Sequence, residues 1–531
     1  MARLRVQRTS CIFCIFTIGT LWVLDSTGAA WLNHGGDLSN TRGAREEMLI
    51  SPWTVRFLRL RWKFSAGKDI SATPATANGV VYFPSWNGYL YAVNAFSGSL
   101  IWQQNLSELT GLRGTGTVVN VTVSRSTPTI AGRLLIVSIY GPAVVIAVSR
   151  FNGRLIWLTR LDPQPLAVIT TSGTAYMRAY YVGVSSLEET LPAVQCCTFR
   201  GSLVKLNILS GAILWQTYTL PDNGGKRGAY AGAAIWGSSP AIDPERRLAY
   251  AATGNLYTAP PEVEECQERQ NNRTTPPKEP DQCIGPDVNF NSIMAFEIES
   301  GRIKWARQLG GYDVWYAACL VPNNPDCPTG PNVDADFGEA PMLITICTNG
   351  TERDIAVAVQ KSGFAWALDR DTGEIVWFRL AGPGSVEGGG IWGAATDGKR
   401  VYTNIANRDR ENFTLSPSTR TTTAGAWVAL DASSGEILWS TANPSNETSQ
   451  GPVSVANGVV FTGSVAPEGP VYAMDAKTGK ILWSYNSGAT VYGGISISYG
   501  CIYHGNGYKV GLVSPFHPTW TGGTDLYSLC V

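Results

Sequence analysis

The chain has 531 residues, with 41 acidic and 41 basic side chains and 18 Trp. A neutral charge balance without basic clusters argues against nucleic acid as a partner. Its three histidines, His34, His504 and His517, argue against a metal site built from several histidines.

The first thirty residues have the pattern of a secretory signal. Arg3, Arg5 and Arg8 precede an apolar stretch from Cys11 to Leu24, and the small residues ending at Ala30 suit cleavage. The apolar stretch is too short for a comfortable membrane span, although an uncleaved anchor is the alternative. We therefore expect residues 1–30 to be removed, leaving a secreted protein without a stable membrane span.

Sequons and cysteines also indicate the secretory route. Nine cysteines follow residue 30, and an oxidising compartment favours disulfides. Cys196 and Cys197 are neighbours, so they either form a strained bridge or pair elsewhere. Six N-x-[ST] sequons predict N-glycosylation, at Asn105, Asn120, Asn272, Asn349, Asn412 and Asn446.

One signature recurs seven times: a polar residue, Gly, three further residues and Trp. The seven copies end at Trp102, Trp157, Trp215, Trp305, Trp377, Trp439 and Trp483. A short alternating strand precedes each copy, and Gly permits positive φ in a tight turn, which predicts a hairpin. Two more strands lie upstream, as in "ATPATANGVVYFPS", so each repeat contains four antiparallel strands.

Four-stranded units repeated around an axis form a β-propeller, which hides strand edges by radial packing. The C-terminus supplies three strands without a closing Trp strand, and "RLRWKF" with Trp62 supplies the missing pattern. We predict an all-β fold over residues 31–531. It is a single domain and an eight-bladed β-propeller of four-stranded antiparallel blades, closed by N- and C-terminal strands. Cys501 and Cys530 would face each other there. Separate β-sandwich domains are the alternative.

One long insertion, residues 259–286, interrupts the repeats. It is polar and proline-rich, so we expect a loop, which Cys266 and Cys283 could staple. Cys319 and Cys327 flank another short loop and are expected to bridge each other.

The repeat and the opening "WLNHGGDLSNTR" resemble the PQQ (pyrroloquinoline quinone)-dependent quinoprotein alcohol dehydrogenases. Together with "CCTFRG", the opening is most similar to the polyvinyl-alcohol-dehydrogenase-like branch. The resemblance implies an enzyme that oxidises an alcohol or polyol by hydride transfer to PQQ, held with Ca²⁺ in the propeller funnel. The chain has no C-x-x-C-H motif for covalent haem, so electrons would pass to a separate acceptor.

The resemblance also implies metal ligands and a base. "YVGVSSLEE" is similar to a family element whose Glu binds Ca²⁺, which indicates Glu188, with Glu189 as the alternative. "TGN" indicates Asn255 as a second ligand. "GGYDVWY" indicates Asp313 as the base for the alcohol proton, beside the metal. Oxygen donors of this kind are those that Ca²⁺ prefers, although a solvated carboxylate or a turn cap is the ordinary alternative.

Further residues would bind the cofactor by the same resemblance. Trp236 would stack on one face of the quinone, and a bridged Cys196-Cys197 pair on the other. Arg200 would pair with a cofactor carboxylate. Lys361, in "QKSGFAWALDR", would contribute to catalysis by stabilising negative charge on the reduced quinone.

Three features favour a second function, a non-catalytic propeller that binds a ligand, polymer or protein partner. Ile391 occupies an amide position of the family pattern, Tyr316 replaces an acidic residue, and the cysteine pair follows Glu188 rather than preceding it. We favour the enzyme because the candidate metal ligands, base and lysine occur together.

Overall fold

The computed structural model describes residues 30–114, 120–270, 281–348, 350–511 and 514–531. The predicted signal segment falls almost wholly outside these ranges, as do the sequons at Asn272 and Asn349. Among the described residues, no helix is both long and apolar enough to cross a membrane.

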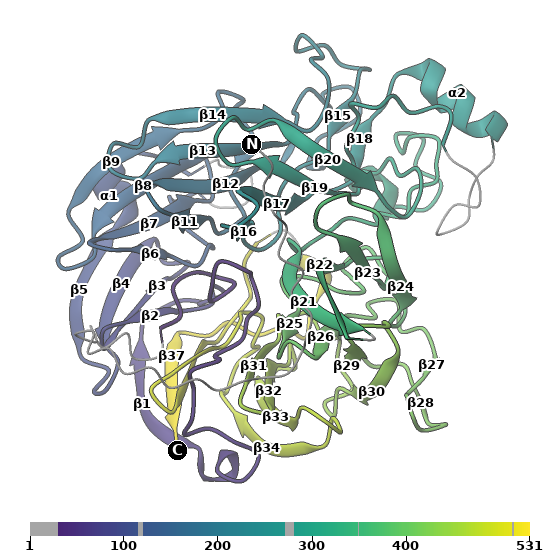
Figure 1. The fold of residues 1–531 in the computed structure, drawn as a ribbon. Helices are drawn as coiled ribbons and strands as arrows, with labels where there is room; N and C mark the ends of the chain where they lie inside the picture. The colour runs from purple at the N-terminus through teal and green to yellow at the C-terminus, as the bar shows by residue number, and fades with distance from the viewer. Residues whose placement is uncertain (1–29, 115–119, 271–280, 349, 512–513) are drawn as a thin grey trace, which may run out of the picture.

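Within these ranges, eight antiparallel sheets are arranged radially around one axis (Figure 1), which confirms the predicted all-β, eight-bladed propeller. The strands of blades 1 to 4 are β2 (Ala75–Ala77), β3 (Val80–Pro84), β4 (Tyr89–Asn94) and β5 (Leu100–Asn105); β6 (Thr129–Ala131), β7 (Leu134–Ile139), β8 (Val144–Ser149) and β9 (Leu155–Arg160); β10 (Ala167–Val168), β11 (Thr174–Tyr176), β12 (Ala179–Ser186), β13 (Ser202–Asn207) and β14 (Ile213–Tyr218); and β16 (Ala241–Asp243), β17 (Leu248–Ala252), β19 (Ser292–Glu297) and β20 (Ile303–Gln308).

Blades 5 to 8 follow in the same order. Their strands are β21 (Met342–Thr348), β22 (Thr351–Val359), β23 (Phe364–Asp369) and β24 (Ile375–Leu380); β25 (Ala395–Thr396), β26 (Arg400–Ile405), β29 (Ala426–Asp431) and β30 (Ile437–Ala442); β31 (Ser454–Ala456), β32 (Val459–Gly463), β33 (Pro470–Asp475) and β34 (Ile481–Asn486); and β35 (Ser496–Ser498), β36 (Cys501–Gly505), β37 (Asp525–Cys530) and β1 (Arg59–Ser65).

Short elements lie between the blades or in the loops that join the strands of one blade. They are the pairs β15 (Ala231–Gly232) with β18 (Leu256–Thr258) and β27 (Phe413–Thr414) with β28 (Thr421–Thr422), the helices α1 (Leu106–Thr110) and α2 (Pro261–Gln270), and the 3₁₀ turns η1 (Val55–Phe57), η2 (Glu188–Thr190), η3 (Ala317–Leu320) and η4 (Ser514–Phe516). The prediction of a loop over the whole insertion 259–286 was therefore wrong. Pro261 opens α2, and acidic side chains occupy its first turn, both of which favour a helix start.

Trp62 and six of the seven signature Trp residues join one blade to the next. A Cβ added at Gly98 would lie 2.6 Å from the ring of Trp62, so the ring packs directly on the turn. Gly98 also has a φ of +72°, which favours Gly for a second reason. The indole N–H groups donate to backbone carbonyls of the following blade: Trp62 to Ala95, Trp102 to Arg150, Trp157 to Ile208, Trp215 to Ile298, Trp305 to Arg370, Trp377 to Ala432 and Trp439 to Ala476.

Strands from both termini close the ring, as predicted. β1 pairs with β37 in an antiparallel register, and the disulfide Cys501–Cys530 crosses from β36 to β37. Disulfides also join Cys196 to Cys197, Cys266 to Cys283 and Cys319 to Cys327.

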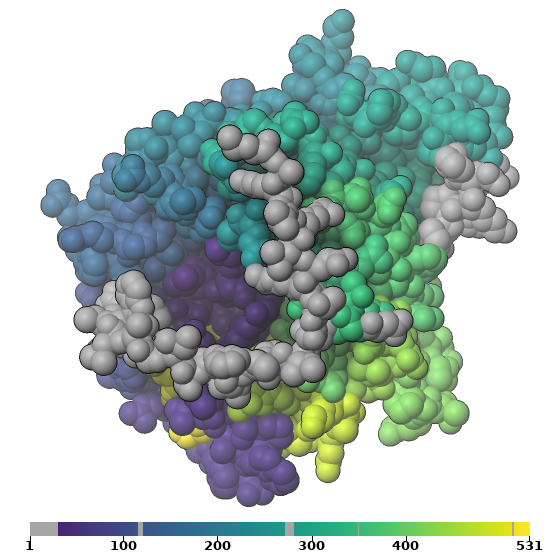
Figure 2. Space-filling view, in the orientation of Figure 1, coloured from purple at the N-terminus to yellow at the C-terminus, as the bar shows by residue number. Residues whose placement is uncertain are grey.

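Residues 31–44 line the inner edge of the ring. Their backbone forms hydrogen bonds with the innermost strands of blades 1, 2, 4, 5, 6 and 7, at Thr76, Ile130, Ile242, Leu343, Thr396 and Val455. The purple segment lies inside the ring in Figure 1, and purple atoms lie at the centre of this face in Figure 2. The N-terminal segment therefore fills one end of the central channel, and the cavity described below lies beyond it.

Candidate active site

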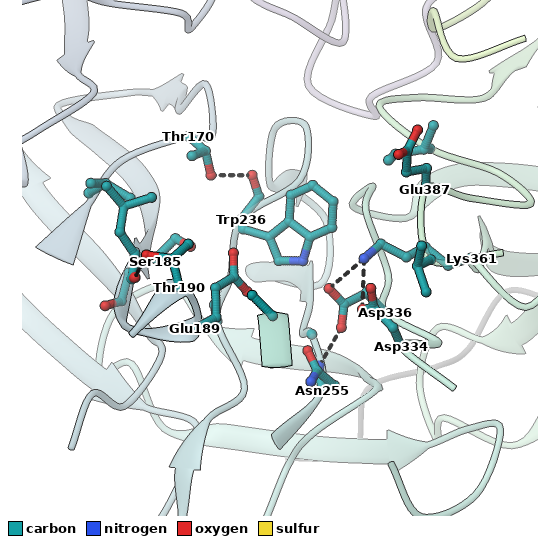
Figure 3. Close-up of a pocket in the computed structure, with 18 of the residues that line it drawn as sticks. Thr170, Ser185, Glu189, Thr190, Trp236, Asn255, Asp334, Asp336, Lys361 and Glu387 are labelled. Atoms are coloured by element: carbon teal, nitrogen blue, oxygen red, sulfur yellow. Dashed lines mark hydrogen bonds and ion pairs between the residues drawn. The ribbon is translucent and has the colours of Figure 1, made fainter. Parts of the chain in front are cut away.

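A cavity of about 390 Å³ lies at the centre of the ring, within the size range of small-molecule sites. It is built from loops that follow the second strands of blades, such as η2 after β12, and from segments that precede the first strands. Figure 3 shows its acidic end. The predicted residues that line it are Trp236, Asn255 and Lys361, together with Glu189 and Ile391.

Trp236 lies in the middle of this arrangement (Figure 3). Its ring meets Trp392 edge to face at 5.1 Å between centroids, and Thr170 Oγ1 donates to its carbonyl at 2.7 Å. The indole Nε1 is buried and has no hydrogen-bond partner among the described residues. An aromatic ring and one unused N–H donor are thus available to a flat ligand.

Lys361 contacts two carboxylates that the sequence had not indicated. Its Nζ lies 2.8 Å from Asp334 Oδ1 and 3.2 Å from Asp336 Oδ2, and all three side chains are buried. Burial disfavours the charged amine, but the two carboxylates outweigh it and raise the pKa of Lys361. Asp336 also accepts the backbone N–H of Asn255, and Lys361 Nζ lies 5.1 Å from the Trp236 ring centroid.

Asp313 does not line the cavity but braces the loop that does. Its carboxylate accepts the backbone N–H groups of Asp334 at 3.0 Å and Ala335 at 2.7 Å, and the side-chain amide of Asn291 at 2.9 Å. Asp334 has a φ of +51°, a left-handed conformation that these bonds hold in place. Burial raises the pKa of Asp313 to about 6.

The two neighbouring glutamates of η2 have different surroundings. Glu188 is buried away from the cavity, where its carboxylate accepts the N–H groups of Thr198 at 2.8 Å and Phe199 at 2.7 Å, and the Thr198 hydroxyl at 2.9 Å. Glu189 lines the cavity. Burial, and then the negative charge of Asp336, raise the pKa of Glu189 to about 7.

The structure does not bring the bridged cysteines or Arg200 to the cavity lining. Cys196 and Cys197 are buried in an apolar cluster with Phe199. Arg200 instead forms an ion pair with Asp222 at 3.0 Å. Both features belong to the loop between β12 and β13, one layer behind the cavity.

Arg125, which the sequence had not indicated, lines the other end of the cavity. Its guanidinium carbon lies 4.4 Å from the Trp392 ring centroid and 5.9 Å from that of Tyr508. Among the described residues it forms no ion pair with a carboxylate, and its polar neighbours are tyrosines, including Tyr492. Its one signal in the sequence is a charged residue within the hydroxyl-rich stretch "VTVSRSTPTI".

The side chains that could bind a metal are few. Within the described residues, no group of three or more His, Cys, Asp or Glu is arranged to hold an ion. Asn255 donates its amide hydrogens to the carbonyls of Leu256 at 2.8 Å and Trp315 at 2.7 Å, so its side-chain oxygen is the acceptor left at the cavity. Glu189 and Asn255 could therefore contribute two oxygen ligands, and others would have to come with a bound ligand.

A ring of four-stranded blades surrounds a cavity with an indole, a paired lysine and crowded carboxylates. The relatives of the chain assign this propeller to the quinoprotein class. The chain belongs to the family described as "Outer membrane protein assembly factor BamB" (PQQ_2), which matches residues 59–307 and 361–498. The resemblance to PQQ-dependent quinoprotein alcohol dehydrogenases, in the polyvinyl-alcohol-dehydrogenase-like branch, is confirmed by the relatives that the chain matches.

Two of these relatives are polyvinylalcohol dehydrogenases. The chain is 31% identical to the one from Pseudomonas sp, over 72% of this chain and 56% of the relative. It is 28% identical to the one from Sphingopyxis sp. (strain 113P3), over 73% and 55% respectively. The chain thus spans just over half the length of these curated relatives.

Solved structures share the fold. The quinohemoprotein alcohol dehydrogenase from Comamonas testosteroni gives a TM-score of 0.70 at 18% identity, covering 94% of this chain and 80% of that chain. A europium-containing methanol dehydrogenase gives 0.70 at 17% identity, covering 96% and 99%.

Proposed function

We propose that this chain is a secreted, PQQ- and Ca²⁺-dependent dehydrogenase that oxidises alcohol groups. The observation that carries the proposal is the convergence of Trp236, Lys361 with its two carboxylates, Asn255 and Glu189 on one cavity. The relatives named for polyvinyl alcohol support an alcohol or polyol as the substrate.

The residues at the cavity fit PQQ, which carries carboxylates on a flat ring system and supplies the acceptor for hydride. Trp236 offers a ring face for stacking and an indole N–H without a partner among the described residues. Arg125 offers a guanidinium that no described carboxylate neutralises. We assign to it the role that the resemblance gave to Arg200, pairing with a cofactor carboxylate. A planar guanidinium suits carboxylate recognition.

Ca²⁺ fits the acidic end if the cofactor supplies the missing oxygens. We assign Glu189 and Asn255 as the protein ligands, with Glu189 in the place first given to Glu188, since the carboxylate of Glu188 is occupied by Thr198 and Phe199. Burial, and then the negative charge of Asp336, raise the pKa of Glu189, and a divalent cation would relieve the repulsion between the two carboxylates.

For the proton of the alcohol we assign Asp336 as the base, rather than Asp313. Asp336 lines the cavity beside Asn255, whereas Asp313 is behind the loop. The Asp336 carboxylate faces the cavity 3.2 Å from Lys361 Nζ, a position from which it can accept the hydroxyl proton. Lys361 also keeps a positive charge near the ring of Trp236, where it would stabilise negative charge on a quinone stacked there.

Secretion and a separate electron acceptor belong to the same proposal. The sequons at Asn120, Asn412 and Asn446 are exposed, and the disulfides suit an oxidising compartment. The sequence holds no haem attachment motif, and we assign the electron acceptor to a separate molecule.

Purified protein incubated with PQQ and Ca²⁺ tests the proposal. We expect calorimetry to show PQQ binding that requires Ca²⁺, and alcohol-dependent reduction of an artificial acceptor dye. The absence of both PQQ binding and dye reduction would overturn the proposal of an enzyme. Binding without turnover would support the second candidate, a non-catalytic propeller, which the apolar Ile391 at the cavity favours.

A further inference from the structure

Residues 45–61 expose large apolar side chains on the surface. The exposed fractions are 84% for Met48, 59% for Leu49, 79% for Trp53 and 54% for Phe57. Single exposed apolar residues are ordinary, but several within one short segment indicate an interaction surface. We call these four residues the Trp53 patch.

The segment that carries the Trp53 patch is firmly anchored. Ile50, Val55 and Leu58 are buried in a core cluster with strands of blades 7 and 8. The buried Glu47 carboxylate accepts the N–H groups of Leu49 at 2.7 Å, Ile50 at 3.2 Å and Gly500 at 3.0 Å. The exposed side chains are therefore held outward by a packed loop.

Positive charge surrounds the Trp53 patch. Arg45, Arg56, Arg59 and Arg61 are exposed, and among the described residues none of them is paired with a carboxylate. Their contacts are with backbone carbonyls or rings, as for Arg59 Nη1 with the carbonyls of residues 56 and 58. Within residues 45–61 the one exposed acidic side chain is Glu46.

The Trp53 patch lies at the end of the propeller opposite the cavity. A Cβ at Gly458 would meet Pro52, and one at Gly500 would meet Leu49 at 2.8 Å, so the segment covers the turns between the first and second strands of blades 7 and 8. The cavity is built from the loops at the other strand ends. The purple lobe at the bottom of Figure 2 shows this segment protruding from the ring.

We propose that the Trp53 patch binds the surface of a lipid bilayer that carries anionic headgroups. A Trp and other apolar side chains would enter the headgroup region, while the unpaired arginines contact the anionic lipids. A second copy of the chain fits less well, because a two-fold contact through this patch would bring the same arginines together. Bound in this way, the chain would present its cavity to the solution.

Sedimentation of the full chain with vesicles tests this proposal. We expect binding to vesicles of mixed phosphatidylcholine and phosphatidylserine, weaker binding to phosphatidylcholine alone, and a decrease with added salt. The double variant Trp53→Ser/Phe57→Ser should lose most of the binding. Arg56→Gln/Arg59→Gln should weaken binding by about tenfold or more at low salt and reduce the salt dependence.

The matched control is Phe151→Ser/Met177→Ser, which removes two exposed apolar side chains from blades 2 and 3. It should bind vesicles like the unchanged chain, and the melting temperatures of all variants verify folding. Vesicle binding that is absent, or equal in the patch variants and the control, overturns the proposal. Light scattering that shows a dimer lost in Trp53→Ser/Phe57→Ser, without vesicle binding, would assign the surface to a second copy instead.

Discussion

The two ends of the cavity differ in charge and in how they are held. The acidic end comes from blades 3 to 5 and contains Glu189, Asp334 and Asp336 around a single Lys361. The aromatic end comes from blades 2, 6 and 8 and contains Arg125 among rings. One end therefore has an excess of carboxylates, and the other has a cation that no described carboxylate pairs. Such polarity orients a ligand whose anionic end meets Arg125 and whose other end binds a cation together with the carboxylates of the acidic end.

The aromatic end is held by redundant packing. Tyr492 and Tyr508 stack with centroids 3.9 Å apart, and Trp392 Nε1 donates to the Tyr492 hydroxyl at 2.7 Å. The acidic end depends instead on single carboxylates, above all Asp313, which accepts three hydrogen bonds. We therefore expect single substitutions to have their largest effects at the acidic end.

The largest effect is expected for Asp336→Asn. If Asp336 accepts the alcohol proton, its removal should lower turnover by about 10²–10⁴-fold, the usual contribution of a general base. Steady-state dye reduction at saturating PQQ and Ca²⁺ measures the loss, and calorimetry determines whether PQQ still binds. The control is Asp334→Asn, which removes the other Lys361 partner and should cost less turnover. Turnover that survives in Asp336→Asn would reject the assigned base.

The next effect is expected for Asp313→Asn, and it should act on stability as well as turnover. An amide at this position faces two backbone N–H groups with only one acceptor oxygen, so we expect a loss of about 2–4 kcal/mol in the free energy of unfolding. Urea unfolding measures it. Turnover should decrease because the loop carrying Asp334 and Asp336 shifts. A complete loss of turnover with unchanged stability would return the role of base to Asp313.

The pH dependence of stability gives an independent test of Asp313. Its pKa is about 6 in the folded protein and 3.8 in the unfolded chain, so the folded state binds the proton more tightly. This contribution to stability is full below about pH 4 and is lost as the pH rises through about 6. Asp313→Asn should remove this contribution. The free energy of unfolding, measured with urea, should therefore differ most between the unchanged chain and the variant at pH 4, and the difference should decrease towards pH 7. A difference that is constant over this range would contradict the burial of an acid at this position.

The fold could be predicted from the sequence because each repeat encodes the same local contact. At each signature turn the Gly packs against the Trp of the preceding blade, as Gly98 does against Trp62. The same contact predicted how strands from the two termini close the ring. The residues of the site were harder to predict from the sequence. Glu188 and Glu189 are consecutive in a 3₁₀ turn, and spacing alone does not decide which carboxylate the N–H groups of the following loop occupy.

Two cavity residues were missed for a related reason. Asp334 and Asp336 alternate in "DAD" shortly before β21, and both contact Lys361 Nζ. Their place at the cavity depends on the left-handed turn at Asp334 and on the hydrogen bonds from Asp313, a contact across 21 residues. No local sequence rule encodes that contact. The same holds for Arg125, whose neighbours come from blades 6 and 8.

A smaller effect is expected for Arg125→Gln at the aromatic end. Loss of a charged hydrogen-bond donor costs about 1.5–3 kcal/mol, which corresponds to roughly 10- to 100-fold weaker PQQ binding. Titration calorimetry measures the affinity, and turnover at saturating PQQ should remain. The matched control is Arg200→Gln, whose guanidinium pairs with Asp222 outside the cavity and whose affinity should be unchanged. The reverse result would place the cofactor carboxylate at Arg200.

The smallest effect on PQQ binding is expected for Cys196→Ser/Cys197→Ser. The resemblance placed this pair on a cofactor face, but in the structure the sulfurs pack with Phe199 behind the cavity. The substitution should therefore lower the melting temperature, through polar groups introduced into an apolar cluster, while PQQ affinity and turnover stay unchanged. A large loss of affinity in a variant that still folds would show that the pair reaches the cofactor, and the layer between them would then have to move on binding.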